Sequence, residues 1–393
     1  MNILDDVSFG KIVEIREVLI KTAARGETVY RFESGDPQFK ISKAQTDAII
    51  EDAAKASMRY VPNAGLPQLR KAIAKKLKEE NRFVDVNDTD VYVTNGAMHA
   101  LYCTYKVLIE EGDEVIVPEP MWTEAVENIR LAGGHPVPVL LKKEDGFIYR
   151  AADIQKKITA KTKAIFLNSP HNPTGSIIPR PELEKIIDLA KKENLWLISD
   201  EAYEHLTVNH VSSQSLSSYN KIISVFSTSK SYCMAGLRVG YVVINKDQTL
   251  LRERMEKILR CSINGVNRLG QIAAIGAITD PNIKSFCEEQ RLKYLDLRDT
   301  MLSIIRQDFS QYLDPYVPEG AFYIWCKITP KLLSDLACKT DVELSDKLAN
   351  VGIGSAPGTA FGSQCTDAIR FSYAAVTKQE IIDGFAKIKK LLS

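Results

Sequence analysis

The chain has 393 residues, which is too long for one ordinary hydrophobic core and predicts a large domain with a smaller one beside it. Its hydrophobic share of 45% and its charged share of 26% are those of a folded globular protein and argue against disorder. With 51 basic and 50 acidic residues the formal net charge is +1, which argues against nucleic-acid binding as the main task.

The N-terminus, residues 1–19, carries acidic residues where a secretory signal would carry a basic start, and no apolar run in the sequence approaches ~18 residues. We therefore expect a cytoplasmic protein without a membrane partner. The seven cysteines are odd in number and widely spaced, and none of them forms a CxxC pair. This pattern argues against a disulfide framework and against a structural zinc site, so no metal is expected.

The first part of the chain has a helical pattern at residues 11–26, a turn at residues 34–37 and strand-like runs near residues 91 and 114. From Lys163 onward, short apolar runs alternate with amphipathic stretches. These runs lie at residues 164–168, 195–199, 222–227 and 241–245. The alternation predicts an α/β fold, in which a large domain contains a mostly parallel sheet flanked by helices.

A long helical stretch at residues 282–309 separates the α/β region from a C-terminal segment, which we interpret as part of a smaller α+β domain. The N-terminal helix can pack on this segment. We therefore predict a large cofactor-binding domain at residues 46–280 and a small domain built from residues 1–45 and 281–393. No linker rich in Gly, Ser or Pro divides them.

Three polar residues follow successive strand-like runs, namely Asn172, Asp200 and Lys230. Their separations of 28 and 30 residues suit βα repeats. In open α/β sheets the ligand crevice lies at the carboxyl ends of the strands. We therefore expect these three side chains to converge although they are distant in sequence.

Lys230 ends the segment Ser227-Thr228-Ser229-Lys230, and Arg238 follows shortly after it. An amine can form a Schiff base with an aldehyde, while hydroxyl and guanidinium groups supply the donors that a phosphate requires. The combination favours a covalently held, phosphorylated aldehyde such as pyridoxal phosphate. Taken alone, a lysine in a serine-rich stretch is usually a solvated surface residue.

Asp200 closes an apolar strand, where a buried anion is costly unless a cation faces it. A protonated pyridine nitrogen would be such a cation, and a cationic ring is an electron sink for a carbanion. A helix N-cap or a structural ion pair is the alternative explanation for Asp200 alone. Asn172 and Tyr203 could donate to a ring oxygen, although a turn and simple packing also account for them.

Residues 94–101 read as a strand end, a glycine turn and a helix start. A helix start with small residues offers free N–H groups to a phosphate, so Gly96, Ala97 and Met98 are candidate anion donors. Trp122 could stack on a planar ring, although an ordinary core or surface position also explains it. The GxxxxGK[ST] and HExxH motifs of nucleotide and zinc sites are absent.

Ten short motifs occur in one order along the chain. They are SGDP, YxxxxGxxxLR from Tyr60 to Arg70, TNGA, the Trp122 loop, HNPTG, SDEAY, STSK, GLRVGY, EGAFY and IRFSY. In this order and spacing they resemble the fold type I pyridoxal-phosphate enzymes, specifically the class I/II aminotransferases of the aspartate aminotransferase superfamily. The resemblance runs from about residue 8 to the end of the chain.

The resemblance implies three catalytic residues: Lys230 would hold pyridoxal 5'-phosphate as a Schiff base and move a proton, Asp200 would pair with the pyridine nitrogen, and Tyr203 would bind the ring oxygen. The implied cofactor-binding set is Gly96, Ala97, Met98, Trp122, Asn172, Asp200, Tyr203, Ser227, Lys230, Arg238 and Tyr60 of the partner subunit. The implied substrate-binding set is Gly35, Asn172 and Arg370, whose planar guanidinium matches a carboxylate.

Because active sites in this family form between two subunits, Tyr60 implies a homodimer by analogy. Some aspartate-specific relatives have Lys where this chain has Met98. A methionine cannot balance the charge of a distal carboxylate, so simple aspartate specificity is not expected. Arg260 and Arg268 lie where relatives can recruit a second basic group from the partner, and a solvated position is the alternative for each.

We predict an aminotransferase that moves the α-amino group of an L-amino acid to a 2-oxo acid by a ping-pong mechanism. A lyase or synthase with the same cofactor and fold, acting by C–S β-elimination or cyclisation, is the main alternative, because a shared carbanion partitions by small differences in orientation. A non-enzymatic cofactor-binding domain is a second alternative, but the resemblance covers nearly the whole chain. The sequence leaves the amino donor and the acceptor open.

Overall fold

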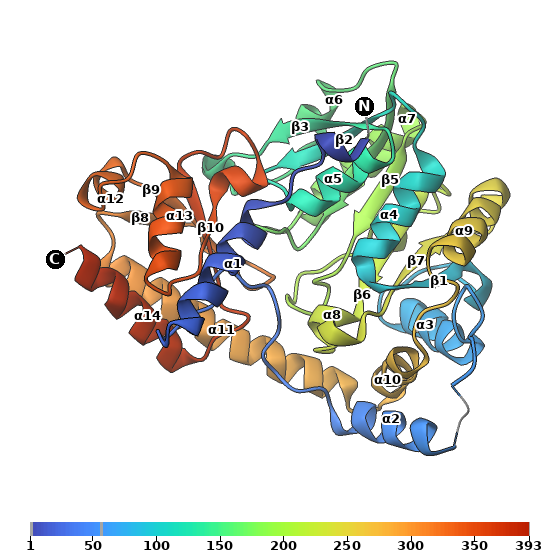
Figure 1. Cartoon of the computed structure of the whole chain (residues 1–393). Coiled ribbons are helices and arrows are strands. Elements are labelled where there is room, and N and C mark those ends of the chain that lie inside the picture. The colour runs from blue at the N-terminus through green and yellow to red at the C-terminus, as the bar shows by residue number, and fades with distance from the viewer. Residues whose placement is uncertain (1–2, 56–57, 393) are drawn as a thin grey trace.

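The computed structural model describes residues 3–55 and 58–392, and its larger sheet has seven strands in the order β1-β7-β6-β5-β4-β2-β3 (Figure 1). The strands are β1 (Val91–Thr94), β2 (Glu114–Glu119), β3 (His135–Leu140), β4 (Thr162–Asn168), β5 (Trp196–Asp200), β6 (Ile222–Ser227) and β7 (Gly240–Ile244). Neighbours pair in parallel except at β7, which runs antiparallel to β1 and β6. The predicted α/β fold with a mostly parallel sheet is confirmed.

Two features of this sheet were not visible in the apolar pattern. Between β6 and β7 the chain forms only the single turn α8 (Thr228–Ser231) and a short 3-10 turn, whereas a parallel crossover usually needs a full helix. The chain therefore turns back and β7 is reversed. Strand β3 contains Pro136 and Pro138, and it is tolerated as a strand because it lies at the edge of the sheet and pairs only with β2.

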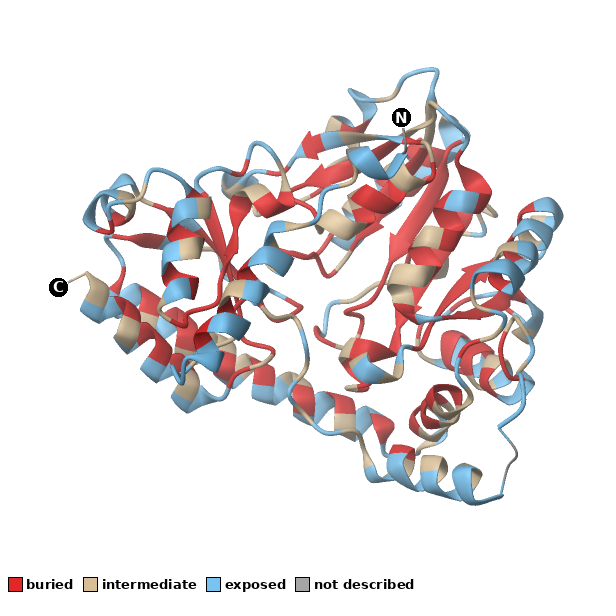
Figure 2. Ribbon diagram, viewed as in Figure 1, coloured by how far each residue is buried: buried red, intermediate tan, exposed pale blue. Residues whose placement is uncertain are grey.

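Helices cover both faces of the large sheet (Figure 1), and the strands between them are almost entirely buried (Figure 2). On β2, Val115 and Val117 join the apolar cluster formed by α4 and α5, while Ile116 joins the cluster formed by α7 on the opposite face. The helices of the first half are α1 (Lys11–Ala24), α2 (Lys43–Lys55), α3 (Pro67–Glu79), α4 (Gly96–Leu108), α5 (Thr123–Leu131), α6 (Ala151–Gln155) and α7 (Arg180–Lys192). Successive side chains of a strand thus pack into apolar layers on opposite faces of the sheet.

A smaller antiparallel sheet lies beside the first, with strands in the order β10-β11-β9-β8. These are β8 (Leu313–Pro315), β9 (Tyr323–Ile328), β10 (Ala356–Pro357) and β11 (Ala368–Ser372). The remaining helices are α9 (Thr249–Ser262), α10 (Arg268–Thr279), α11 (Ile283–Asp308), α12 (Pro330–Asp335), α13 (Asp341–Asn350) and α14 (Lys378–Leu391). Helix α1 packs on α13, and Tyr30 bridges to Ile353, so both ends of the chain contribute to this part. The domain limits at residues 45 and 280 stay a prediction.

The described residues also bear on membranes, disulfides and metals. Within them, no helix combines the length and the apolar character that crossing a lipid bilayer requires. All seven cysteines are free thiols. No cluster of three or more His, Cys, Asp and Glu side chains in this part of the chain is arranged to hold a metal ion.

Candidate active site

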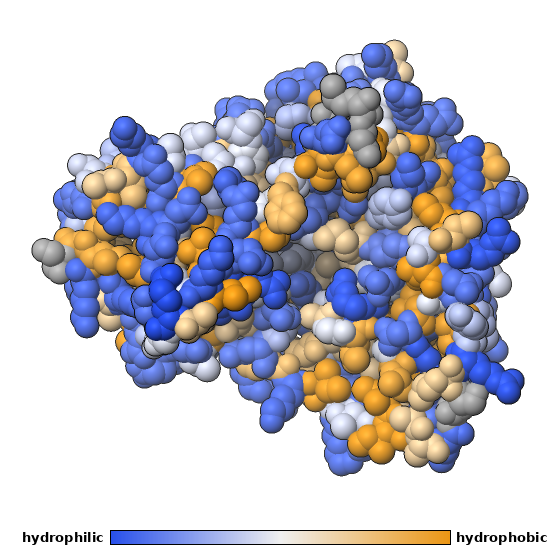
Figure 3. Space-filling view, in the orientation of Figure 1, coloured by the Kyte–Doolittle hydropathy of each residue, from blue (hydrophilic) through white to orange (hydrophobic). Residues whose placement is uncertain are grey.

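A cavity of about 580 Å³ lies between the two sheets and opens where the face in Figure 3 is hollowed at its centre. Asn168, Asp200 and Ser227 line it from the carboxyl ends of β4, β5 and β6. Tyr323 and Arg370 line it from the small sheet. The cavity therefore occupies the edge at which parallel α/β sheets place their ligands.

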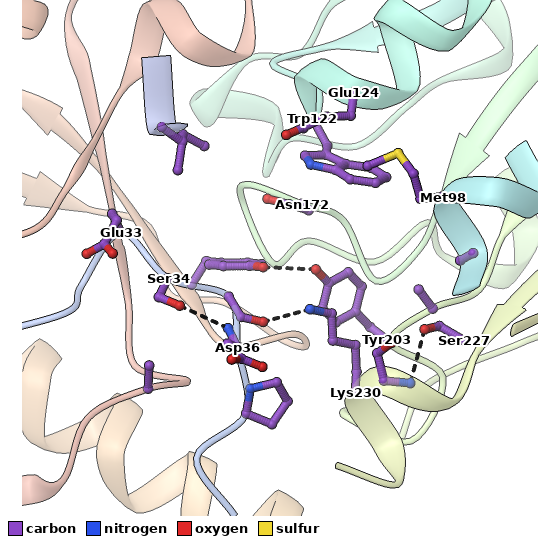
Figure 4. A pocket seen from close by; sticks show the side chains of 18 of the residues that line it. Glu33, Ser34, Asp36, Met98, Trp122, Glu124, Asn172, Tyr203, Ser227 and Lys230 are labelled. Carbon is purple, nitrogen blue, oxygen red and sulfur yellow. Dashed lines mark hydrogen bonds between the residues drawn. The ribbon is translucent and has the colours of Figure 1, made fainter. Parts of the chain in front are cut away.

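Lys230 enters the cavity from α8, the turn that follows β6 directly (Figure 4). Ser227 caps this turn, because its Oγ accepts a hydrogen bond of 3.1 Å from the N–H of Ser229. The Nζ of Lys230 donates to the carbonyl oxygen of Gly35 at 2.6 Å. Burial lowers the pKa of Lys230 to about 8, although Asp36 opposes this effect. Near neutral pH a fraction of the amine is therefore unprotonated and nucleophilic.

Asp200 is the last residue of β5 and is only 3% exposed. One of its oxygens, Oδ1, accepts a hydrogen bond of 3.1 Å from the N–H of Ala202. Burial raises the pKa of Asp200 to about 7, while this N–H and Lys230 oppose the increase. Among the described residues no basic side chain forms a salt bridge with Asp200, so this buried carboxyl lacks a directly paired cation.

Donors for an anion gather where α4 begins. The first turn of α4 starts at Gly96, and Ala97 lines the cavity together with Ser227 and Arg238. A Cβ added to Gly96 would lie 2.5 Å from Nη2 of Arg238, and one added to Gly240 would lie 2.6 Å from the N of Ala97. The two glycines thus let a guanidinium and the free N–H groups of a helix start come together, which is an anion-binding arrangement.

Arg370 reaches the cavity from β11 and is only 3% exposed. Its Nη1 donates to Oδ1 of Asn172 at 2.9 Å, and its Nη2 donates to the carbonyl oxygen of Glu33 at 2.7 Å. The guanidinium lies 4.2 Å from the ring centre of Tyr323, and its Nε is buried without a hydrogen-bond partner. Burial lowers the pKa of Arg370, but a guanidinium remains charged at every physiological pH.

Two tyrosines meet at the cavity, one in the loop after β5 and one in the small sheet. The hydroxyl of Tyr203, just after β5, lies 2.9 Å from the hydroxyl of Tyr323 at the start of β9 (Figure 4). Burial raises the pKa of Tyr203 well above its ordinary value. Both phenols therefore remain protonated and can act as hydrogen-bond donors.

Most residues that the sequence assigned to the site line this one cavity. They are Gly35, Ala97, Met98, Trp122, Asn172, Asp200, Tyr203, Ser227, Lys230, Arg238 and Arg370. Gly96 does not line it but lies against the side chain of Arg238. The convergence of the three polar residues after successive strands is therefore observed.

Tyr60, Arg260 and Arg268 do not line the cavity of their own chain. Tyr60 is 88% exposed, and it lines a separate surface hollow with Arg268. The guanidinium of Arg268 is held by Asp52 through hydrogen bonds of 2.8 and 2.6 Å. Arg260 lies exposed on α9.

The cavity also contains residues to which the sequence gave no role. Among them are Glu33, Asp36, Glu124, Ser229 and Tyr323. Asp36, Ser229 and Tyr323 stand inside the SGDP, STSK and EGAFY motifs, so a signal for them existed. Glu33 and Glu124 carried no such signal, because acidic residues are usually exposed.

These residues fit pyridoxal phosphate at three points. Lys230 offers a buried amine to an aldehyde, and a pyridinium would give Asp200 a directly paired cation. The start of α4 forms a cradle that a Cβ on Gly96 or Gly240 would fill. When bound, this cofactor supplies an electron sink that stabilises a carbanion at a substrate's α-carbon. Fold and site together define a pyridoxal-phosphate enzyme of the α/β type.

The chain belongs to the family described as aminotransferase class I and II, whose family model matches residues 27–388. It is 35% identical over 379 residues to the probable aspartate/prephenate aminotransferase of Aquifex aeolicus, covering 94% of this chain and 92% of that protein. It is 34% identical over 376 residues to the aspartate aminotransferase of Bacillus sp. strain YM-2, with 93% of both chains covered. Among solved structures, the aspartate aminotransferase of Thermus thermophilus with maleate matches with a TM-score of 0.91 at 28% identity, covering 99% of this chain and 98% of that one.

The resemblance stated from the motifs is therefore confirmed. The chain is a pyridoxal-phosphate-dependent aminotransferase, an enzyme that transfers the α-amino group of an L-amino acid to a 2-oxo acid.

Proposed function

We propose that amino acid and 2-oxo acid bind in turn, in a ping-pong cycle, in the cavity between the two sheets. One observation carries this proposal: Lys230, Asp200 and Arg370 are distant in sequence but line the same cavity. They provide an amine of lowered pKa, a buried carboxyl that lacks an ion-pair partner, and a buried guanidinium. These are the groups that anchoring an aldehyde, holding a pyridinium and binding a carboxylate require.

Lys230 has two tasks in this proposal. It anchors the cofactor through its amine, and it then moves a proton at the substrate's α-carbon. A pKa of about 8 suits both tasks, because a catalytic base works best when its pKa lies near the working pH. The carbonyl of Gly35 orients the amine through the 2.6 Å hydrogen bond.

Asp200 holds the ring nitrogen in its protonated form, and Asn172 and Tyr203 donate to the ring oxygen. Trp122 covers one face of the ring. The phosphate is held by Ser227, Arg238 and the first turn of α4 at Gly96, Ala97 and Met98. The cradle at Gly96 and Gly240 supports the assignment of the phosphate site.

Arg370 binds the α-carboxylate, assisted by Gly35 and Asn172. The unpartnered Nε supports this role, because a buried donor without an acceptor is costly and a substrate carboxylate would supply one. The rings of Tyr323 and Phe361 lie 4.2 and 4.8 Å from the guanidinium and restrict its movement.

The functional form in this proposal is a homodimer in which Tyr60 serves the phosphate site of the other subunit. Tyr60 and Met58 are 88% and 57% exposed, and they line a surface hollow together with residues 264–268. Exposed apolar side chains that gather in one place are typical of interaction surfaces, which supports the proposed dimer. Seven free thiols support a reducing, cytoplasmic location.

A direct test mixes the cofactor-loaded enzyme with an L-amino acid, with and without 2-oxoglutarate or pyruvate. We expect the 2-oxo acid product to accumulate over many turnovers only when an acceptor is present. Release of ammonia without any acceptor would instead identify a lyase. The variant Lys230→Ala should lose both turnover and the absorbance of the covalently bound cofactor, and wild-type turnover in this variant would refute the assignment of Lys230.

A further inference from the structure

Glu124 is a charged residue of the cavity that the proposed roles leave without a task. It lies in the first turn of α5 and lines the cavity with Met98 and Trp122. Figure 4 shows its side chain beside the indole of Trp122, on the side away from Lys230. Glu124 therefore borders the part of the cavity that a substrate side chain would enter.

The carboxyl of Glu124 is only partly paired among the described residues. Burial raises its pKa, while the residue's own N–H and the charge of Arg370 oppose the increase. Its Oε2 is buried without a hydrogen bond, and among the described residues no basic side chain forms a salt bridge with it. Glu127, the next acidic residue of the same helix, also has a buried Oε2 without a hydrogen bond, but its Oε1 is paired with Arg130 at 2.6 Å. A buried carboxylate oxygen without a hydrogen bond is costly, so the Oε2 of Glu124 can accept a hydrogen bond from a donor outside the chain.

Glu124 is held firmly relative to Arg370. The hydroxyl of Thr123 donates to the carbonyl of Ala360, and the N–H of Met121 donates to the carbonyl of Phe361 at 2.7 Å. The ring of Phe361 in turn lies 4.8 Å from the guanidinium of Arg370. A substrate anchored by its carboxylate on Arg370 thus meets Glu124 at a fixed place.

The walls near Glu124 are apolar. Ile12, Met98 and Trp122 line the same cavity, and the sulfur of Met98 accepts a hydrogen bond of 3.4 Å from Asn128 of α5. Such walls favour the aliphatic stem of a side chain over a second carboxylate. Arg16 also lines this cavity and has no ion-pair partner among residues 3–55 and 58–392, but it is exposed, so water can solvate its charge.

We propose that the preferred amino donor is an L-amino acid whose side chain has an apolar stem and ends in a cationic nitrogen, which donates to Glu124. This inference rests on the function proposed for the cavity. A negatively charged side chain would be repelled by the same carboxylate, and Met98 offers it no compensating charge.

The test compares L-lysine and L-arginine with L-norleucine and L-glutamate in the half-reaction of the cofactor-loaded enzyme. The half-reaction is followed by the change in absorbance of the bound cofactor, so no acceptor is needed. We expect kcat/KM for the cationic donors to exceed that for the other two. Glu124→Gln should lower the lysine-to-norleucine ratio about 10- to 100-fold, the factor expected when a charge-assisted hydrogen bond is lost. Glu127→Gln, on the same helix but outside the cavity, is the matched control and should keep the wild-type ratio.

Binding gives a second readout that does not depend on turnover. Calorimetry on the loaded enzyme should show tighter binding of 5-guanidinopentanoate than of 7-methyloctanoate, which has a similar shape without nitrogen, and Glu124→Gln should remove the difference. If Glu124→Gln slows all donors equally, or if glutamate is preferred, the inference is overturned while the proposed function stands. If no amino acid reacts in the half-reaction, both are overturned.

Discussion

Arg370 Nη1 donates a hydrogen bond of 2.9 Å to Oδ1 of Asn172, which joins the small sheet to the loop after β4. A guanidinium can only donate, so Oδ1 must face it and the amide nitrogen of Asn172 must point elsewhere. The donor end of Asn172 is thereby left for another acceptor. In the proposed site this coupling links the group that binds the substrate carboxylate to the group that binds the cofactor's ring oxygen.

Arg370→Lys keeps the charge but loses the planar fork, which donates one hydrogen bond to Asn172 and one to the carbonyl oxygen of Glu33. We expect binding of every amino-acid substrate to weaken by about 1–3 kcal/mol, in line with charge-assisted hydrogen bonds. The measurement is the concentration dependence of the half-reaction. Arg260→Lys, on the exposed face of α9, serves as the control, and unchanged affinity in Arg370→Lys would remove Arg370 from the site.

Asp200→Asn replaces the buried carboxyl by an amide of nearly the same shape. Because an amide cannot balance a cationic ring nitrogen, we expect the half-reaction to slow by about a hundredfold or more, while Lys230 still holds the cofactor. Stopped-flow absorbance measures the rate, and the absorbance before mixing reports cofactor binding. A half-reaction at the wild-type rate would contradict the role given to Asp200.

Gly240→Ala tests the anion cradle. The new Cβ would lie 2.6 Å from the N of Ala97 and 2.8 Å from the carbonyl oxygen of Phe226, so the first turn of α4 must move. We expect stability to fall by about 1–3 kcal/mol, and cofactor binding to weaken in equilibrium dialysis. Gly236→Ala is the matched control, because a Cβ there meets nothing within 4 Å. Equal cofactor affinity in both variants would rule out the proposed cradle.

Glu204→Gln tests a buried ion pair away from the cavity. Lys76 of α3 lies 2.5 Å from Glu204, and Asn81 donates to the same carboxylate at 2.7 Å. The substitution removes the carboxylate that is directly paired with the buried ammonium of Lys76, so we expect the free energy of unfolding to fall by about 3–5 kcal/mol. Denaturant unfolding of the cofactor-free protein measures it. Glu253→Gln, which breaks an exposed pair with Lys257, should change little, and a similar small effect of both substitutions would contradict the prediction.

The same pair predicts a dependence of stability on pH. Burial by itself raises the pKa of Glu204, but Lys76, His205 and His210 together lower it from 4.5 to about 2. The folded state therefore binds fewer protons than the unfolded state, and the stabilisation is complete above about pH 4.5 and is lost as the pH falls toward about 2. The difference in unfolding free energy between wild type and Glu204→Gln should accordingly shrink over that interval. A difference that stays constant across it would contradict the assignment.

Local patterns were sufficient to predict much of the fold and the outline of the site. Asp200 and Lys230 were predicted at the ends of apolar runs, and the helix predicted at residues 282–309 is α11 (Ile283–Asp308). The reason is that a parallel sheet aligns the carboxyl ends of its strands, so position along the chain translates into position in space. The reversal of β7 was not predictable in this way, because it depends on the length of one connection.

The partners of the side chains in the cavity could not be read from the chain alone. Tyr203 with Tyr323, and Arg370 with Asn172, are separated by 120 and 198 positions, and their contacts depend on how the two sheets meet. Likewise the pKa values of Lys230 and Asp200 shift because neighbouring elements exclude water from them. Residue types and their order thus specified the family and its chemistry. Packing specified which polar atoms are left without a hydrogen bond, the Oε2 of Glu124 among them, because burial is a property of the assembled fold.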